Sequence, residues 1–265
     1  MNFVWKIGTV VILSTILQAQ EYIGIIKPIY DIELSALVEG KIDKLFIKEG
    51  DRVKIGDNLI RIDDKLQRLE MDRREIIWKD TAQLSSAKKN SKILKSLLHS
   101  TQMLYNKTKA VSRDDLRVLE MKYYTAKGDI QAQIENEKKE KIEYEIAKNI
   151  LSEYTIISPI DGIVTNITKQ KSEWTKTGEI LLRIVNTDLC FLEINVDEKY
   201  ATRVEKGKFV NFKIALQEKF ITIKGKVIFV SPVADNSSGL VRLKIQFDNR
   251  VQQITPGISA SINLD

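Results

Sequence analysis

The residues that could bind a metal ion or perform catalysis are few in this chain. Among its 265 residues there is one cysteine, Cys190, and one histidine, His99. A zinc site built from cysteine and histidine needs several such ligands, so the sequence predicts no metal site, and one cysteine allows no internal disulfide. We expect Cys190 to be a small buried hydrophobe and His99 to lie on a helix surface or in a helix–helix seam.

Catalytic fingerprints are missing as well. The sequence contains no nucleophile elbow, P-loop, zinc-protease or dinucleotide-binding motif. The acid pair of Asp63 and Asp64 stands where a helix would begin, which is a common place for solvated carboxylates. The sequence therefore predicts neither enzymatic activity nor a cofactor.

Charge is spread along the whole chain. The formal net charge is +6, from 42 basic and 36 acidic residues, but the two signs are mixed and form no concentrated basic face. Nucleic acid is therefore not an expected partner. With 43% hydrophobic and 29% charged residues the chain has the composition of a folded protein.

The first 20 residues have the layout of a secretory signal. Lys6 is followed by an apolar run from Ile7 to Leu17 and then by the small residue Ala19. Such a run is too short to span a bilayer comfortably. We predict a signal peptide over residues 1–20, with an uncleaved anchor as the alternative, and export to a bacterial periplasm.

A short β-rich motif occurs twice. Residues 37–63, LVEGKIDKLFIKEGDRVKIGDNLIRID, align without a gap on residues 159–185, at an offset of 122. One copy cannot bury its apolar face, so we predict that the two copies dock as a small β-sandwich. Arg61 and Arg183, near the ends of the copies, are expected to be solvated. Both copies have glycines at the same two positions, where we expect structural turn residues: Gly40, Gly56, Gly162 and Gly178.

The segment between the copies has the character of long helices. It contains one glycine, Gly128, and no proline. From Leu116 to Tyr154 apolar residues recur at alternating steps of three and four, a heptad seam typical of a coiled coil. The seam turns polar only around Gln133 to Glu140.

The helical pattern is interrupted once, at NKTKAVSRDD (106–115). There, Ser112 followed by acids has the features of a helix N-cap. We predict an antiparallel coiled-coil hairpin over residues 64–154, with arms of roughly 60 Å. An arm of that length extends far beyond a compact core, which indicates that its tip contacts a distant partner.

The last part of the chain alternates in the manner of β-strands. From Cys190 to Leu264, short runs of alternating apolar and polar residues are separated by turn signals such as Pro256-Gly257. This spacing predicts a small antiparallel barrel or sandwich, and we expect residues 22–34 to supply its first strand.

These segments carry a resemblance to a known family. The two repeat copies resemble the lipoyl-type half-motifs of the periplasmic adaptor proteins, also called membrane fusion proteins or the HlyD family. The stretches LEINVDEKYATRVEKGKFVNFKI and LVRLKIQFDN resemble that family's β-barrel module. The expected fold is an elongated α+β molecule with three nested parts. These parts are a β-barrel from residues 21–34 and 187–265, a lipoyl-like β-sandwich from 35–63 and 155–186, and the hairpin from 64–154.

The resemblance implies a bridge across the periplasm. Family members associate with the inner membrane, assemble into trimeric or hexameric rings, and join an inner-membrane transporter to a TolC-like outer-membrane channel. We expect the chain to be such an adaptor in a tripartite efflux system. A resistance-nodulation-division (RND) pump is favoured, with an ABC-type exporter or a type I secretion system as the alternative.

The resemblance also points to the hairpin tip. In adaptors of RND pumps the tip commonly carries Arg, then Leu four residues later, then Ser seven after that. Alignment on AVSRDDL places Thr101, Tyr105 and Ser112 at these positions, so only the serine is kept. The predicted channel contacts are Thr101, Tyr105, Val111, Ser112 and Arg113. From the residues alone, Ser112 is equally well explained as a helix cap, and Thr101 and Tyr105 as seam positions.

Two other function classes compete with the adaptor. In a lipoyl or biotinyl carrier, a lysine on an exposed hairpin turn between the half-motifs is itself acylated. Lys65 follows the first copy, but it opens a long helix instead. A structural coiled-coil protein of the envelope, with no pump, is the third class.

Overall fold

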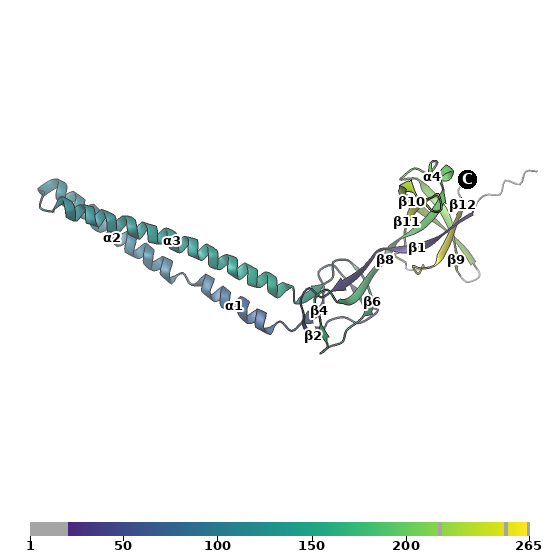
Figure 1. Cartoon of the computed structure of the whole chain (residues 1–265), viewed down its shortest axis with the longest axis horizontal. Coiled ribbons are helices and arrows are strands. Elements are labelled where there is room, and N and C mark those ends of the chain that lie inside the picture. Colours follow the sequence, from purple (N-terminus) through teal and green to yellow (C-terminus); the bar gives the residue numbers. More distant parts are fainter. Residues whose placement is uncertain (1–20, 217–218, 252–253, 264–265) are drawn as a thin grey trace, which may run out of the picture.

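The computed structural model describes residues 21–216, 219–251 and 254–263. The molecule is elongated, with a helical hairpin at one end, a β-barrel at the other and a β-sandwich between them (Figure 1). The described chain starts and finishes in the barrel, as the nested prediction requires. The predicted signal peptide, residues 1–20, lies outside the described residues.

The barrel closes through antiparallel strands. Its strands are β1 (Glu21–Ser35), β8 (Ile180–Asp197), β9 (Phe209–Leu216), β10 (Lys219–Ala234), β11 (Leu240–Asp248) and β12 (Ser259–Asn263). Among the described residues they pair in the order β1-β12-β9-β10-β11-β8, and β8 pairs back onto β1. A short helix, α4 (Glu198–Ala201), follows β8. The prediction that the N-terminal segment supplies the first barrel strand is confirmed.

Alternation along the strands builds the barrel core. In β11 every second side chain, from Val241 through Leu243 and Ile245 to Phe247, is buried. The Phe247 ring meets Phe212 of β9 edge-on, with ring centroids 5.2 Å apart. Period-two burial of this kind is what one core-facing side of a sheet requires.

The sandwich consists of two sheets built from the repeat. Its short strands are β2 (Gly40–Leu45), β3 (Arg52–Val53), β4 (Asn58–Ile62), β5 (Thr155–Ile157), β6 (Gly162–Ile167) and β7 (Trp174–Thr175). One sheet has the order β5-β4-β2-β7, and the other continues from the inner halves of β1 and β8 through β6 to β3. β8 runs unbroken past the predicted boundary near residue 187, and the second half of β1, as far as Ser35, pairs with it in the sandwich, so a two-stranded ribbon joins the sandwich to the barrel (Figure 1).

Equivalent backbone hydrogen bonds join the two copies of the repeat. The Ile42 amide donates to the Glu173 carbonyl at 2.9 Å, and the Val164 amide donates to the Asp51 carbonyl at 3.0 Å. Each residue in the first contact is 122 positions from its counterpart in the second. The shared core includes four matched pairs that are fully buried: Ile42 with Val164, Leu59 with Leu181, Ile60 with Leu182, and Ile62 with Ile184. The predicted docking of two half-motifs into one sandwich is confirmed.

Two arginines of the repeat differ from expectation in one respect. Arg61 pairs with Asp43 at 2.5 Å, and Arg183 pairs with Asp31 of β1. Both side chains remain partly exposed to solvent, as expected, at 34% and 47%, and the unexpected feature is that carboxylates of neighbouring strands pair with them. Both carboxyl groups, beside their arginines, have a pKa below the usual range.

The hairpin consists of three helices. They are α1 (Lys65–Lys79), α2 (Ala82–Thr108) and α3 (Arg113–Ser152). The upstream arm breaks at Asp80 and Thr81, where the Asp80 carboxylate accepts from the Ala82 amide at 2.9 Å. This break was not predicted from the sequence. An aspartate that bonds to a backbone amide two residues ahead offers the chain a local alternative to the helix.

The arms meet along heptad-spaced positions. In α2, Leu84 and Ser91 are buried one heptad apart, and in α3, Ala126 and Ala147 are buried three heptads apart. Trp78 stacks on Tyr144 across the arms, with ring centroids 5.2 Å apart. This spacing supports the coiled-coil prediction.

Candidate functional site

The tip turn lies between the end of α2 and the start of α3. Lys109 adopts a left-handed conformation with φ 55°, and its amide donates to the Tyr105 carbonyl at 3.1 Å. The Lys109 ammonium lies 4.2 Å from the centre of the Tyr105 ring, a cation–π contact. The Thr108 hydroxyl accepts from the Ala110 amide at 3.3 Å. These contacts give the tip a defined shape.

Ser112 caps the second helix of the tip. It has extended backbone angles, and its hydroxyl accepts from the Asp114 amide at 3.2 Å. Asp114 and Asp115 occupy the first turn, where carboxylates interact favourably with the helix dipole. The predicted N-cap is therefore confirmed.

The structure gathers most of the predicted contact residues at the tip. Ser112 and Arg113 are exposed there, and Val111 is half-buried in the turn. Tyr105 is half-buried, three heptads after Leu84 and two after Ser91, which places it in the seam register. Four of the five residues therefore lie around one turn.

Thr101 lies apart from the other four residues, one helical turn upstream of Tyr105. Its hydroxyl donates to the Leu97 carbonyl at 2.8 Å within the same helix. Its role in channel contact stays a prediction.

Sequence reasoning missed Lys109. A residue that ends a helix in the left-handed region is usually glycine or asparagine, so a lysine there gave no signal. We use the name tip surface for Tyr105, Lys109, Val111, Ser112 and Arg113. It carries two cations and one aromatic ring on a hydrogen-bonded turn, which suits docking rather than bond-breaking chemistry.

The two explanations of Ser112 can be separated by a pair of substitutions. We expect Ser112→Ala to destabilise the hairpin by about 1 kcal/mol, whereas Ser112→Asn should preserve the cap. Thermal unfolding of the full chain, followed by helical circular dichroism, measures this difference. If only the cap matters, Ser112→Asn should keep export in complemented cells. Loss of export by both variants would assign Ser112 a direct contact.

The four repeat glycines meet two different backbone demands. Gly56 and Gly178 have φ of 88° and 80°, a region that side chains disfavour. Gly40 and Gly162 begin strands, and a Cβ atom there would lie 2.6 Å from Ile62 and 2.7 Å from Ile184 respectively. Glycine is thus required at Gly56 and Gly178 by the backbone conformation of a turn. At Gly40 and Gly162 it is required because a neighbouring side chain packs directly against the backbone.

Lys65 is not placed as a carrier lysine. It is the first residue of α1, and its exposed ammonium lies 3.9 Å from the Asp63 carboxylate. An intact-mass measurement should therefore find neither a lipoyl nor a biotinyl adduct on the chain purified from its native cell. An adduct localised to Lys65 by peptide mapping would instead establish a carrier.

The described residues offer no metal centre. Across the part of the chain that the structure describes, no three His, Cys, Asp or Glu side chains gather as potential ligands. Within the same residues, no helix combines the length and apolarity needed to cross a membrane.

A hairpin held by a repeat-built sandwich, itself inserted into a barrel, defines an adaptor scaffold. Residues 31–187 match the family model described as RND MFP, barrel-sandwich hybrid domain, and residues 191–265 match the CusB-like, beta-barrel domain. The chain therefore belongs to the membrane fusion protein family of RND type. Members of this family are periplasmic adaptors of efflux systems and not enzymes.

Two curated relatives match most of the chain. An uncharacterized protein of Haemophilus influenzae is 22% identical over 85% of this chain and 51% of its own length, so the chain spans about half of that relative. The 36 kDa antigen of Helicobacter pylori is 24% identical over 88% of this chain and 81% of the relative.

Solved structures share the fold. MacA from Actinobacillus actinomycetemcomitans has a TM-score of 0.79 and 25% identity, covering 93% of this chain and 78% of MacA. ZneB from Cupriavidus metallidurans has a TM-score of 0.52 and 19% identity, covering 91% and 69% of the two chains. At 19% identity, the second likeness speaks for the fold alone.

Proposed function

We propose that this chain is the periplasmic adaptor of a tripartite export system and bridges an inner-membrane transporter to a TolC-like outer-membrane channel. The observation that carries the proposal is the separation of its two ends: the tip surface and the barrel lie at opposite ends of an elongated molecule (Figure 1). A helix of 40 residues such as α3 is about 60 Å long, which gives the hairpin its reach. Export through the N-terminal signal would place the chain in the periplasm.

An RND pump is the favoured transporter. Both family models that match the chain support this choice, since one carries RND in its description and the other is CusB-like. An ABC-type exporter or a type I secretion system is the alternative. In this proposal the inner-membrane transporter, not the adaptor, selects the transported substrate.

The transporter class can be identified directly. A C-terminal tag, mild crosslinking of native envelopes and mass spectrometry of the co-purified membrane proteins should recover an RND pump and an outer-membrane channel. Recovery of an ABC transporter with the channel would keep the adaptor and change its energy source. Recovery of neither, from abundant folded protein, would favour the structural coiled-coil class.

We further propose that copies of the chain pack side by side in a trimeric or hexameric ring. The base of the hairpin exposes apolar side chains that a lone copy leaves in water: Leu66, Leu69, Ile76, Ile142, Ile146 and Ile150. Leu66, Ile146 and Ile150 line one groove of about 440 Å³ between α1 and α3. Exposed apolar surface of this kind is typical of an interaction site.

The ring proposal predicts a mass change. Ile146→Glu should shift the protein toward the monomer in light scattering, because a charge in an apolar contact is costly. Glu120→Gln, far along α3, is the control and should leave the mass unchanged. A wild-type chain that is monomeric at every concentration, including with its partners present, would contradict the ring.

A further inference from the structure

The joint between barrel and sandwich, which we name the waist, is a point where β1 and β8 lose register. Pro28 pairs with Cys190 but Tyr30 pairs with Asn186, so β8 contains two more residues than β1 over this stretch. The extra residues fall within 187–189. A bulge of this kind bends a strand and strengthens its local twist.

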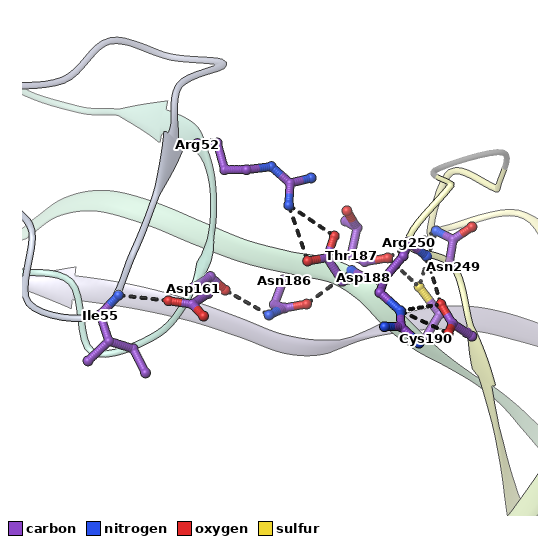
Figure 2. Close-up of polar contacts among 10 residues, drawn as sticks. Arg52, Ile55, Asp161, Asn186, Thr187, Asp188, Cys190, Asn249 and Arg250 are labelled. Carbon is purple, nitrogen blue, oxygen red and sulfur yellow. Dashed lines mark hydrogen bonds and ion pairs between the residues drawn. The ribbon is translucent and has the colours of Figure 1, made fainter.

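Asp188, inside the bulge, contacts both parts of the molecule. Its backbone carbonyl accepts a hydrogen bond from the backbone amide of Asn249, in the barrel, at 2.8 Å. Its carboxylate accepts two hydrogen bonds from Arg52 of the sandwich, at 3.1 and 3.2 Å. Figure 2 shows the Arg52 side chain, from β3 of the sandwich, directed toward this carboxylate.

Asn249 fixes the bulge to the barrel. The side chain is buried, with 4% exposure. Its amide group donates to the carbonyls of Thr187 at 3.0 Å and Ile254 at 2.8 Å, and its oxygen accepts from the Ile254 amide at 3.2 Å. A buried side chain that is satisfied on both sides in this way is costly to displace.

Asn186 joins the bulge to the sandwich. Its side-chain amide donates to the Asp161 carbonyl at 2.7 Å, and its oxygen accepts from the Asp188 amide at 3.0 Å. The Asp161 carboxylate in turn accepts from the Ile55 amide at 2.8 Å. These contacts form one connected path through the waist (Figure 2).

The contacts of the waist differ in their exposure to water. The Arg52 and Asp188 side chains are 54% and 32% exposed, so their ion pair is weak and salt screens it. The nearby Arg250 pairs with Asp248 and also interacts electrostatically with Asp188, and both carboxylates help to raise the pKa of the arginine. One contact is thus easily broken while the buried anchor remains.

We propose that Arg52 and Asp188 form a reversible latch that sets the angle between barrel and sandwich, with Asn249 as the fixed anchor about which the joint opens. With the ion pair formed, a rotation of the barrel is passed to the sandwich and hairpin as one body. With the pair broken, the ribbon bends at the bulge. This inference concerns the isolated chain and holds whatever the partner proteins are.

Distances between two spin labels test the latch in the full mature chain. Lys171→Cys places a label on an exposed loop of the sandwich, and Lys213→Cys places one on an exposed face of the barrel. The native Cys190 is fully buried, and burial raises the pKa of its thiol to about 11, so it should take no label. Pulsed electron paramagnetic resonance then reports the distribution of the barrel–sandwich distance.

We expect one narrow distribution in the wild-type chain at low salt. Arg52→Gln and Asp188→Asn should each broaden it, and the double variant should broaden it no further, because both changes remove the same pair. Salt at about 1 M should broaden the wild-type distribution and leave the variants unchanged. A double variant that swaps the two charges, Arg52→Asp with Asp188→Arg, should restore the ion pair and narrow the distance distribution again.

Arg61→Gln is the matched control. It removes an arginine–aspartate pair, with side chains 34% and 38% exposed, that lies wholly within the sandwich. Its distribution should equal that of the wild type. An unchanged width in folded Arg52→Gln, or equal broadening in Arg61→Gln, would overturn the latch.

Discussion

We expect Gly24→Ala to destabilise the barrel by about 3 kcal/mol, the upper range for an extra methyl group in a tight core. A Cβ atom at this position in β1 would lie 2.3 Å from the Glu193 carbonyl oxygen and 2.1 Å from the Ile194 side chain. The carbonyl belongs to the backbone of β8, so relief requires a shift of the strand that closes the barrel on β1. Urea unfolding, followed by hydrogen exchange of the barrel strands, measures the loss.

The same substitution elsewhere serves as its control. Gly128 lies inside α3, and a Cβ atom there meets no atom within 4 Å. Gly128→Ala should stabilise the hairpin by up to about 1 kcal/mol, because alanine is the better helix former. If Gly24→Ala had no effect on barrel stability, the close approach of β1 to β8 would be wrong.

The second large effect is expected at the tip surface. Arg113→Glu should weaken binding to the outer-membrane channel roughly tenfold or more, as expected of a central charged contact. The change should not unfold the hairpin, because a carboxylate in the first turn of α3 interacts favourably with the helix dipole. Export in complemented cells and binding of the purified channel are the two measurements.

A nearby arginine distinguishes contact from charge. Arg117 is exposed one turn further along α3, and its guanidinium lies 3.7 Å from the Asp114 carboxylate. Arg117→Glu should change channel binding little. Equal loss in both variants would indicate that net charge, not the tip surface, governs docking. Wild-type binding by Arg113→Glu would remove this residue from the contact.

Much of the fold could be predicted because the sequence contains a repeated motif and a regular spacing of apolar residues. The offset of 122 predicted a sandwich of two equivalent halves, and the structure shows their hydrogen bonds in matched pairs. The scarcity of glycine and the absence of proline predicted the hairpin, and Ser112 with its acids predicted where α3 begins. The alternation after Cys190 predicted the barrel.

The features that sequence analysis missed depend on tertiary neighbours. The partners of Arg61 and Arg183 stand on adjacent strands, so strand register had to be known first. The bulge in β8 is a difference of two residues between strands more than 150 positions apart, and no local pattern marks it. Lys109 adopts a conformation that other residue types prefer, so its propensity gave no sign of the turn.

The measurement that tests the bridge most directly is crosslinking from both ends in the same cells. A photoreactive amino acid at Arg113 of the tip surface should capture an outer-membrane channel. The same amino acid at Arg203, just after α4 at the far end of the barrel, should capture an inner-membrane transporter (Figure 1). At Lys138, midway along α3, it should capture neither. We expect two different membrane proteins from the two ends. Capture of one protein equally from both ends, or of none from either, would contradict the bridge.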